Sequence, residues 1–243
     1  MKRLLLLTLT LLLSSCFDVR EEVTVAADGS GRLVFDYSVP PTALRAVRGK
    51  EGIREEIDKL IASEPRVRLE TLEIIDDGTD ARIHIEIVAD TMLALMDLKQ
   101  TEAFQDLPAS SRNLAGTIDV RLDGLKVQTH REINVANALG LATLAIGREE
   151  REQRQFEYII HLPKAAENHN ADLVEDNGRT LIWKRTLGQA LDEPIHQRYT
   201  APIPLPAWVI PAVVIVAMLI VLGIVSLVRS IRRKMSAQME ASS

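Results

Sequence analysis

Histidine and carboxylate side chains are the residues of this sequence from which a metal site or an acid–base catalyst could be built. The histidines are scattered along the chain, and no two of them form a helical or turn pair with the spacing of metal ligands. One weak alternative stays open where two histidines bracket a loop that also contains Asn168 and Asn170. We expect the histidines to face solvent, and we predict neither a metal site nor a bound cofactor. The histidines are His84, His130, His161, His169 and His196.

The motifs of several large enzyme classes are absent from the sequence. It contains no G-x-S-x-G nucleophile elbow, no P-loop and no G-x-G-x-x-G dinucleotide motif. Gly29-Ser30-Gly31 suits the turn of a hairpin rather than a nucleophile site. Paired carboxylates would have to face each other in a cleft to exchange protons, and sequence spacing does not show this. We therefore predict that the protein is not an enzyme and has no catalytic residues.

The single cysteine, Cys16, indicates a different chemistry. Lys2 and Arg3 precede the apolar run Leu4–Leu13, which is too short to span a bilayer and is typical of a secretory signal. The run ends in Leu13-Ser14-Ser15-Cys16, which resembles the lipobox of bacterial lipoproteins. That resemblance implies removal of residues 1–15 and acylation of Cys16, with palmitate as an expected acyl group. The alternative is an uncleaved leader with an idle thiol.

A second membrane anchor is predicted near the C-terminus. The stretch Ala207–Val228 contains no charged residue, and an uncharged apolar run of roughly 20 residues is what a helix needs to cross a bilayer. An aromatic residue at its start and basic residues after its end suit a helix whose C-terminal side is cytoplasmic. These interface residues are Trp208, Arg229, Arg232, Arg233 and Lys234. We predict a single-pass protein of the bacterial cytoplasmic (inner) membrane, with a periplasmic or otherwise extracytoplasmic domain and a basic cytoplasmic tail, residues 229–243.

The charge of the domain limits its partners. The whole chain has a formal net charge of −5. Six basic residues but only one acidic residue lie in the leader and tail, so the domain between them carries about −10. Such a domain repels phosphate backbones, so we expect no nucleic-acid partner. Membrane lipid is the expected partner, through the two anchors.

Alternating apolar residues around Asp- and Gly-rich turns predict three β-hairpins. They cover residues 19–38, 67–89 and 117–133. Further strands are predicted near residues 156–162, 172–175, 179–187 and 194–200, and a proline-rich spacer, residues 201–206, follows. One anchor closely precedes the domain and the other closely follows it. We therefore expect the last strand to return to the end where the first begins.

Apolar residues at helical spacing predict helices over Thr42–Ser63 and Thr91–Leu107, the second capped by Asp90. The uncharged stretch Val135–Ile146 is either a buried helix or a mobile, membrane-dipping segment. Together these elements predict an α+β domain, residues 16–200. We expect an antiparallel, hairpin-rich curved sheet covered by two or three helices and followed by one C-terminal transmembrane helix.

Two apolar stretches are candidates for binding an amphiphile. Methionine and leucine on the helix after Asp90 are the adaptable residues that line promiscuous apolar sites, although such a stripe also suits a plain core. The leucines of the uncharged stretch 135–146 suit a lid over the same site. The candidate ligand or lid residues are Met92, Leu95, Met96, Leu139, Leu141, Leu144 and Ile146.

The order of these features resembles the LppM-type lipoproteins of bacteria. The matching motifs are Leu13-Ser14-Ser15-Cys16, residues 156–163 (FEYIIHLP), Asn170-Ala171 and residues 178–183 (GRTLIW). The resemblance implies lipid or glycolipid binding at the cell envelope and supplies no catalytic residues. The expected function is therefore a membrane-anchored lipoprotein whose domain binds a lipid or amphiphile. The alternative is a non-catalytic interaction or assembly module for a membrane protein complex.

Overall fold

The structure is a computed structural model, and it describes residues 18–46, 48–78, 80–204 and 218 of the chain. The described residues up to Pro204 belong to one compact unit. The predicted leader, lipobox and C-terminal apolar helix lie outside the described residues. Within the described part of the chain, no helix combines the length and the apolar composition needed to span a bilayer.

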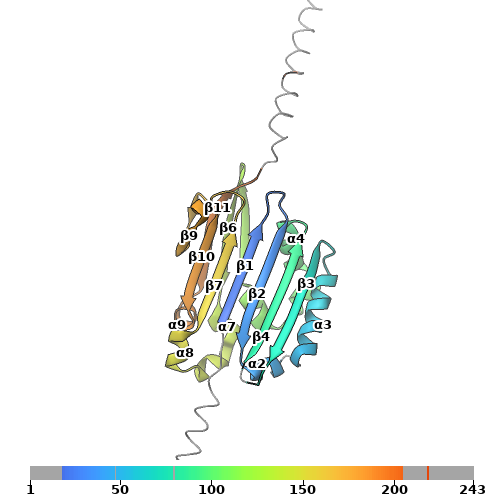
Figure 1. The fold of residues 1–243 in the computed structure, drawn as a ribbon, viewed down its shortest axis with the longest axis vertical. Helices are drawn as coiled ribbons and strands as arrows, with labels where there is room; N and C mark the ends of the chain where they lie inside the picture. The colour runs from blue at the N-terminus through green and yellow to red at the C-terminus, as the bar shows by residue number, and fades with distance from the viewer. Residues whose placement is uncertain (1–17, 47, 79, 205–217, 219–243) are drawn as a thin grey trace, which may run out of the picture. The chain divides into compact units, whose positions relative to one another are not determined.

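Seven strands form a mixed sheet in the order β3-β4-β2-β1-β7-β10-β9 (Figure 1). All neighbours are antiparallel except β1 and β7, which run parallel with Val19 opposite Phe156. The prediction of a purely antiparallel sheet is wrong at this one pair, which joins two strands that lie far apart in the sequence. The bounds are β1 Asp18–Val25, β2 Gly31–Val39, β3 Val67–Asp76, β4 Ala81–Ala89, β7 Gln155–His161, β9 Leu173–Glu175 and β10 Thr180–Thr186.

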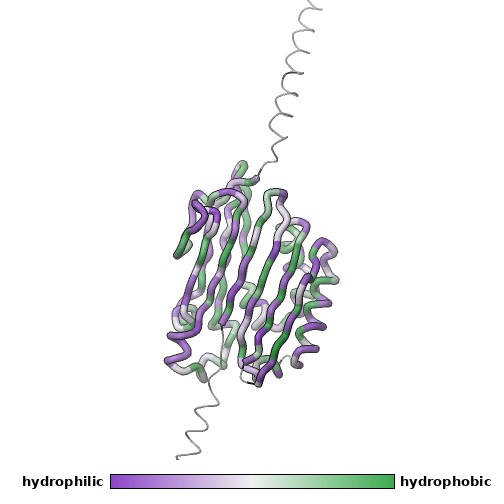
Figure 2. The backbone as a smooth tube through the Cα atoms, viewed as in Figure 1, coloured by the Kyte–Doolittle hydropathy of each residue, from purple (hydrophilic) through white to green (hydrophobic). Residues whose placement is uncertain are grey.

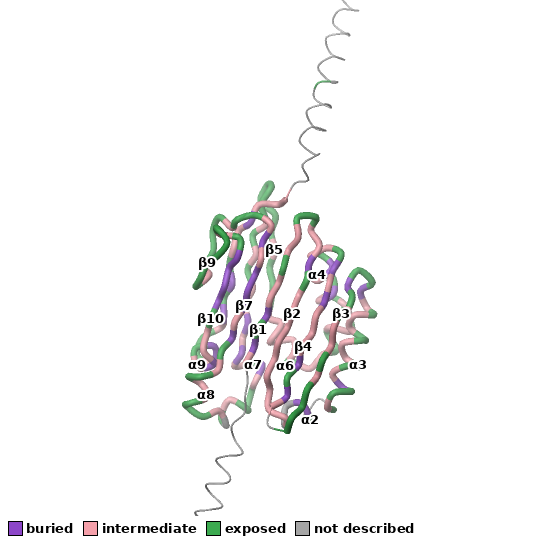
Figure 3. Tube along the Cα trace, in the orientation of Figure 1, coloured by how far each residue is buried: buried purple, intermediate pink, exposed green. Residues whose placement is uncertain are grey.

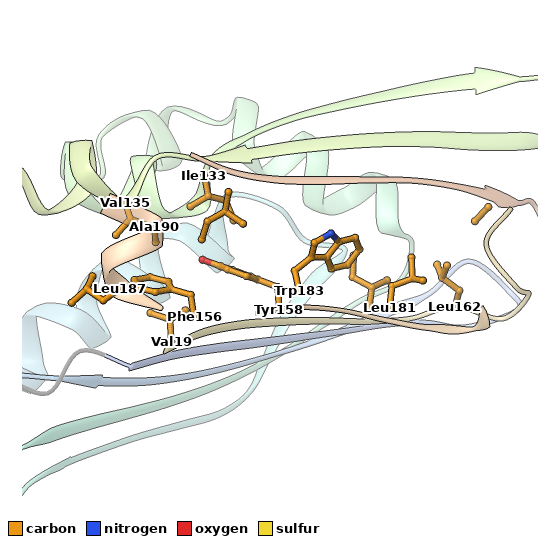
Figure 4. Packing of buried hydrophobic residues seen from close by; sticks show 13 residues of the cluster. Val19, Ile133, Val135, Phe156, Tyr158, Leu162, Leu181, Trp183, Leu187 and Ala190 are labelled. Carbon is orange, nitrogen blue, oxygen red and sulfur yellow. The ribbon is translucent and has the colours of Figure 1, made fainter. Parts of the chain in front are cut away.

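A second sheet of four antiparallel strands, in the order β5-β6-β11-β8, packs against the inner side of β7 and β10. The core between the sheets contains Phe156, Leu181 and Trp183, each fully buried, and Figure 4 shows the cluster. The sequence predicted one sheet, because nothing local in a strand shows which sheet it joins. The bounds are β5 Thr117–Asp123, β6 Lys126–Ile133, β8 Asn168–His169 and β11 Ile195–Pro202.

Helices cover the other half of the large sheet. The helix α3 (Gly49–Ala62) and the helix α4 (Met92–Gln100) pack with β3 and β4 around a second buried cluster that includes Val67, Ala94 and Leu98. The strands alternate between hydrophobic and hydrophilic residues (Figure 2), and many of the buried positions lie on β7 and β10 (Figure 3). The remaining helices are α2 Pro41–Ala46, α5 Glu102–Gln105, α6 Ala109–Ala115, α7 Val135–Leu139, α8 Arg148–Gln153 and α9 Leu187–Asp192.

The three predicted hairpins are confirmed as β1–β2, β3–β4 and β5–β6. The predicted helices are each interrupted. Thr42–Ser63 divides into α2 and α3 because Arg48 and Gly49 have left-handed backbones with φ of 63° and 73°. Thr91–Leu107 divides at Thr101, whose side chain caps α5. The predicted cap Asp90 is wrong as well, because the Thr91 hydroxyl accepts the hydrogen bond from the Ala94 N–H.

The described chain enters and leaves the domain at opposite ends of its strands. The carboxylate of Asp18, at the start of β1, accepts a hydrogen bond from the Gln155 N–H. The Leu187 N–H, at the start of α9, donates to the carbonyl of Arg154, the residue before Gln155. The start of β1 and the start of α9 therefore lie at the same end of the sheet. The strand β11 starts after α9, at this same end, and runs the length of the sheet to Pro202. The expectation that the last strand returns to the end where β1 begins is therefore wrong.

Candidate functional site

The predicted methionine-bearing stretch forms α4 and begins directly on the β1–β2 turn. The Met92 N–H donates to the Gly29 carbonyl at 2.9 Å, and the Met92 sulfur lies 2.3 Å from where a Cβ on Gly31 would be. Met92, Leu95 and Met96 are all half-buried. Leu95 packs against the second buried cluster, between α4 and the large sheet. This part of the predicted apolar site therefore belongs to the helix-covered half of the domain.

The uncharged stretch Val135–Ile146 is part core and part surface. It begins as α7 and continues as a 3₁₀ helix, Gly140–Ala145. Leu139 and Ile146 pack against the core between the two sheets. In contrast, Leu141 and Leu144 have exposed fractions of 86% and 84%. The predicted residues thus divide among two clusters and the surface, and their role as one ligand site stays a prediction.

The exposed pair Leu141 and Leu144, named here the entry leucines, lies at the end of the domain where β1 begins. The Arg151 guanidinium on α8 donates to the Thr143 carbonyl within the 3₁₀ helix at 3.1 Å. Arg154, directly after α8, forms an ion pair with Asp18 at 3.0 Å. These contacts connect the exposed leucines to the first described residue of the domain.

A second exposed pair, Leu122 and Leu125, lies at the opposite end and is named here the exit leucines. Their exposed fractions are 73% and 61%. They flank the β5–β6 turn, and the Ile203 N–H, beyond the end of β11, donates to the Leu125 carbonyl at 2.8 Å. Sequence reasoning missed them because they read as ordinary members of an alternating hairpin. The strand β6 and the short helix α7 lie between the two leucine pairs in the chain.

Charged groups lie in the interior between the sheets. The Glu21 carboxylate, in a residue that is 3% exposed, pairs with the Arg131 guanidinium at 2.7 Å and accepts a hydrogen bond from the Tyr37 hydroxyl at 2.9 Å. The Arg131 guanidinium also lies over the Tyr158 ring, 5.3 Å from its centroid. Nearby, the Lys99 ammonium donates to the Gly116 carbonyl. Burial, and then the Arg131 charge, lowers the pKa of Lys99 to about 8. Since every charge here has a partner, the cluster is best explained as structural.

The outer face of the four-stranded sheet carries a polar groove of about 450 Å³. Arg121 at its edge pairs with Asp119, whereas the Arg198 side chain is exposed and makes no ion pair with another described residue. Asn170 closes one side, because its amide oxygen accepts hydrogen bonds from the Trp183 indole and the Arg198 N–H. The groove therefore offers hydrogen-bond donors to a polar ligand.

The same face brings together His130, Glu132 and His196, whose potential ligand atoms all lie within 4.8 Å of one another. Sequence analysis did not predict this cluster, since His196 comes from a different strand. His84 and His161 lie on the outer face of the large sheet, where they contact Asp36 and Glu22 at 2.6 and 3.0 Å.

A groove of about 510 Å³ also crosses the outer face of the large sheet. Much of its charge is internally paired, because Glu157 contacts both Arg20 and Lys184 and His84 contacts Asp36. Neither this groove nor the first is lined by the apolar residues predicted from the sequence. The predicted lipidation residue and membrane-interface residues lie outside the described residues, namely Cys16, Trp208, Arg229, Arg232, Arg233 and Lys234.

No protein-family model and no curated protein sequence matches this chain. Among solved structures, the chain is similar to the folded domain of LppM from Mycobacterium tuberculosis, which was determined by NMR. The two chains are 14% identical, and the match covers 78% of this chain and 91% of the other, with a TM-score of 0.45. The similarity concerns the folded domain, without the lipobox or the C-terminal apolar helix.

Proposed function

We propose that this chain is a bacterial envelope lipoprotein, acylated at Cys16 and anchored by residues 207–228, whose extracytoplasmic domain binds lipid at the surface of the cytoplasmic membrane. The observation that carries the proposal is the position of the two exposed leucine pairs. The entry leucines lie where the described chain enters the domain, and the exit leucines lie where it leaves. Exposed apolar side chains at both anchor points favour contact with lipid over contact with water.

Chain length limits how the domain is oriented between the two anchors. Asp18 follows Cys16 by two residues and Ala207 follows Pro204 by three, so even extended connections reach only about 7 and 10 Å. An eight-residue strand such as β11 is about 26 Å long. If the strands stood upright, one anchor would fall short of the bilayer by about 15 Å. We therefore propose that the strands lie along the membrane surface and present both leucine pairs to it.

The polar groove of the four-stranded sheet supports a headgroup contact in this orientation. It borders β6 between the two leucine pairs, and its residues include Gln128 and His130 of that strand. Arg198 and the neighbouring histidine and amide groups suit the phosphate or sugar hydroxyls of a lipid or glycolipid. We therefore propose that the polar part of the ligand lies along this groove.

Photo-crosslinking tests lipid contact. The full chain is reconstituted into bilayers that contain a phospholipid with a diazirine in its acyl chain, and the labelled peptides are identified by mass spectrometry. We expect label on peptides that contain the entry and exit leucines, and a loss of at least fivefold at the entry site in Leu141→Asp/Leu144→Asp. The control is Ile75→Asp, which replaces another exposed apolar residue, 52% exposed on the large sheet. Equal labelling in all three proteins would refute the proposal.

The exposed leucines also support a second candidate, an assembly module that docks on a membrane protein. Apolar patches of this kind mark protein interfaces as well as lipid contacts. Cross-linking in native membranes separates the two candidates. One reproducible protein partner, lost in Leu141→Asp/Leu144→Asp, favours the assembly role. Lipid adducts without such a partner favour the lipid-binding role.

A further inference from the structure

The outer face of the four-stranded sheet carries three side chains of the types that bind transition metals. His130 and Glu132 are two residues apart on β6, so their side chains share this face. His196 on β11 lies directly opposite Glu132 in the strand register. The His196 Nδ1 is 3.7 Å from the Glu132 carboxylate, and the two imidazole rings are 5.8 Å apart, centroid to centroid.

We propose that His130, Glu132 and His196 bind one Zn²⁺ ion. Two imidazoles and one carboxylate form the three-ligand set of open zinc sites, in which water completes a tetrahedron. Ligand atoms about 2.0–2.2 Å from zinc lie about 3.3 Å from one another in such a geometry. The three atoms present here lie within 4.8 Å of each other. Rotations of exposed side chains close the remaining gap without movement of either strand.

The three side chains are available for this role. Apart from the contacts among themselves, none of them has a side-chain hydrogen bond or ion pair with another described residue. All are solvent-accessible, which provides an entry path for the ion. Hard ions such as Mg²⁺ and Ca²⁺ prefer oxygen ligands, so the two imidazoles select a transition metal.

Neighbouring charges modulate the site. Asp119 on β5 lies opposite His130 on one side, and Arg198 on β11 lies opposite it on the other. The Arg198 cation opposes a bound metal ion, whereas the Asp119 charge is shared with Arg121. We therefore expect a zinc site of moderate affinity, of the exchangeable kind rather than a closed structural site.

The experiment is a Zn²⁺ titration of the metal-free full chain in detergent, read by competition with a chromophoric chelator and by isothermal titration calorimetry. We expect one Zn²⁺ per chain. His130→Ala, Glu132→Gln and His196→Ala should each weaken binding by more than about tenfold, since even an outer-shell partner of a metal ligand is worth that much. The matched control is His84→Ala, which removes a half-buried histidine beside a carboxylate, on the outer face of the large sheet.

A second readout separates loss of the site from loss of the fold. Far-ultraviolet circular dichroism of each variant without zinc should match the unaltered chain, while Zn²⁺ should raise the thermal midpoint of the unaltered chain and of His84→Ala only. No binding, half-stoichiometric binding between two copies, or binding that survives His196→Ala would each overturn the site. The inference does not depend on the proposed lipid contact, which the photo-crosslinking tests separately.

Discussion

The Lys99 ammonium lies in the space between the sheets, and its burial makes the stability of the folded state depend on pH. Burial lowers the pKa of Lys99 to about 8 from its usual 10.5. Between these two values the unfolded chain binds more protons than the folded one, so this residue makes the folded state more stable as pH rises. Burial raises the pKa of Tyr37 and of Tyr158, so these residues act in the opposite direction, but only as pH approaches the ordinary tyrosine pKa of about 10.

The first prediction concerns this residue. In Lys99→Met the rise in unfolding free energy between pH 7.5 and 9.5 should be smaller than in the unaltered chain. Urea unfolding at each pH, followed by circular dichroism of the chain in detergent, measures it. An identical pH dependence in the two proteins would show that the Lys99 ammonium is not desolvated. Lys126→Met is the control, because this lysine pairs with Glu167 at the surface.

The second prediction concerns the buried ion pair. Glu21→Met or Arg131→Met alone leaves one charge in the interior without its partner and should cost about 3–5 kcal/mol of unfolding free energy. The double variant removes both charges and should cost less than the sum of the single effects by at least about 1 kcal/mol. Urea unfolding of the four proteins gives this coupling energy. Additive costs would contradict a direct interaction.

At the residue scale the sequence predicts which way side chains face, but not which residues meet. Alternation in β4 and β6 correctly places His84 and His130 on the outer faces of their sheets. Bringing His196 to Glu132 requires the register between β6 and β11, and four other strands and several helices separate these in the chain. Sequence analysis did not predict the exposure of Leu122 and Leu125 for a related reason. A period-two pattern shows that Leu122 faces the inner side, but not that an edge strand leaves it uncovered.

Hairpin turns are the elements that local sequence predicts best, and the ends and interruptions of helices are what it predicts worst. The hairpins follow from Asp and Gly in turns of a few residues, so all of their information is local. The helix breaks depend on Arg48 in a left-handed conformation and on Thr101 as an internal cap. Either residue also fits within a helix, so only packing against the sheet decides whether the helix continues or breaks there. The parallel pairing of β1 with β7 has no local signal at all.

The third prediction concerns the connection between α6 and β5. Gly116 has φ +70°, and a Cβ there would lie 2.3 Å from the Glu132 carbonyl oxygen. Gly116→Ala should therefore cost more than about 2 kcal/mol, through both backbone strain and a clash with β6. Gly29→Ala is the matched control, with a similar positive φ of +88° but nothing within 4 Å. It should cost only the backbone strain, about 1 kcal/mol. Thermal and urea unfolding compare them, and equal costs would contradict the close approach.

At the scale of the whole molecule, the proposed anchors and the fold together limit the orientation of the domain on the membrane. The sequence alone led to the expectation that both ends of the domain meet at one point on the membrane, because it does not show the direction of β11 relative to β1. The structure places these ends a full strand length apart. The proposed double attachment then favours a domain that lies along the surface rather than one that stands on it.

The fourth prediction follows from the short connections. A flexible Gly/Ser insertion of about 15 residues after Pro204 lets the exit end leave the membrane, because its root-mean-square span is about 20 Å. We expect lipid photo-crosslinking at the exit leucines to fall, while labelling of the entry leucines persists beside the acyl anchor. The same insertion into the β3–β4 turn, after Gly78, should leave both unchanged. Unaltered labelling at the exit leucines would show that the short connection does not hold them at the membrane.

The most direct test of the lipid-surface proposal is the depth of both leucine pairs in one preparation. Spin labels are placed at Leu144→Cys, at Leu122→Cys and at the control Asp58→Cys on α3, in the full chain with Cys16 replaced by serine and reconstituted into bilayers, so that the introduced cysteine is the thiol that is labelled. Electron paramagnetic resonance compares collision with oxygen, which enriches in lipid, and with a water-soluble nickel complex. We predict that both leucine positions favour oxygen while the control favours nickel. Nickel-accessible labels at either leucine pair would contradict a domain that lies along the membrane.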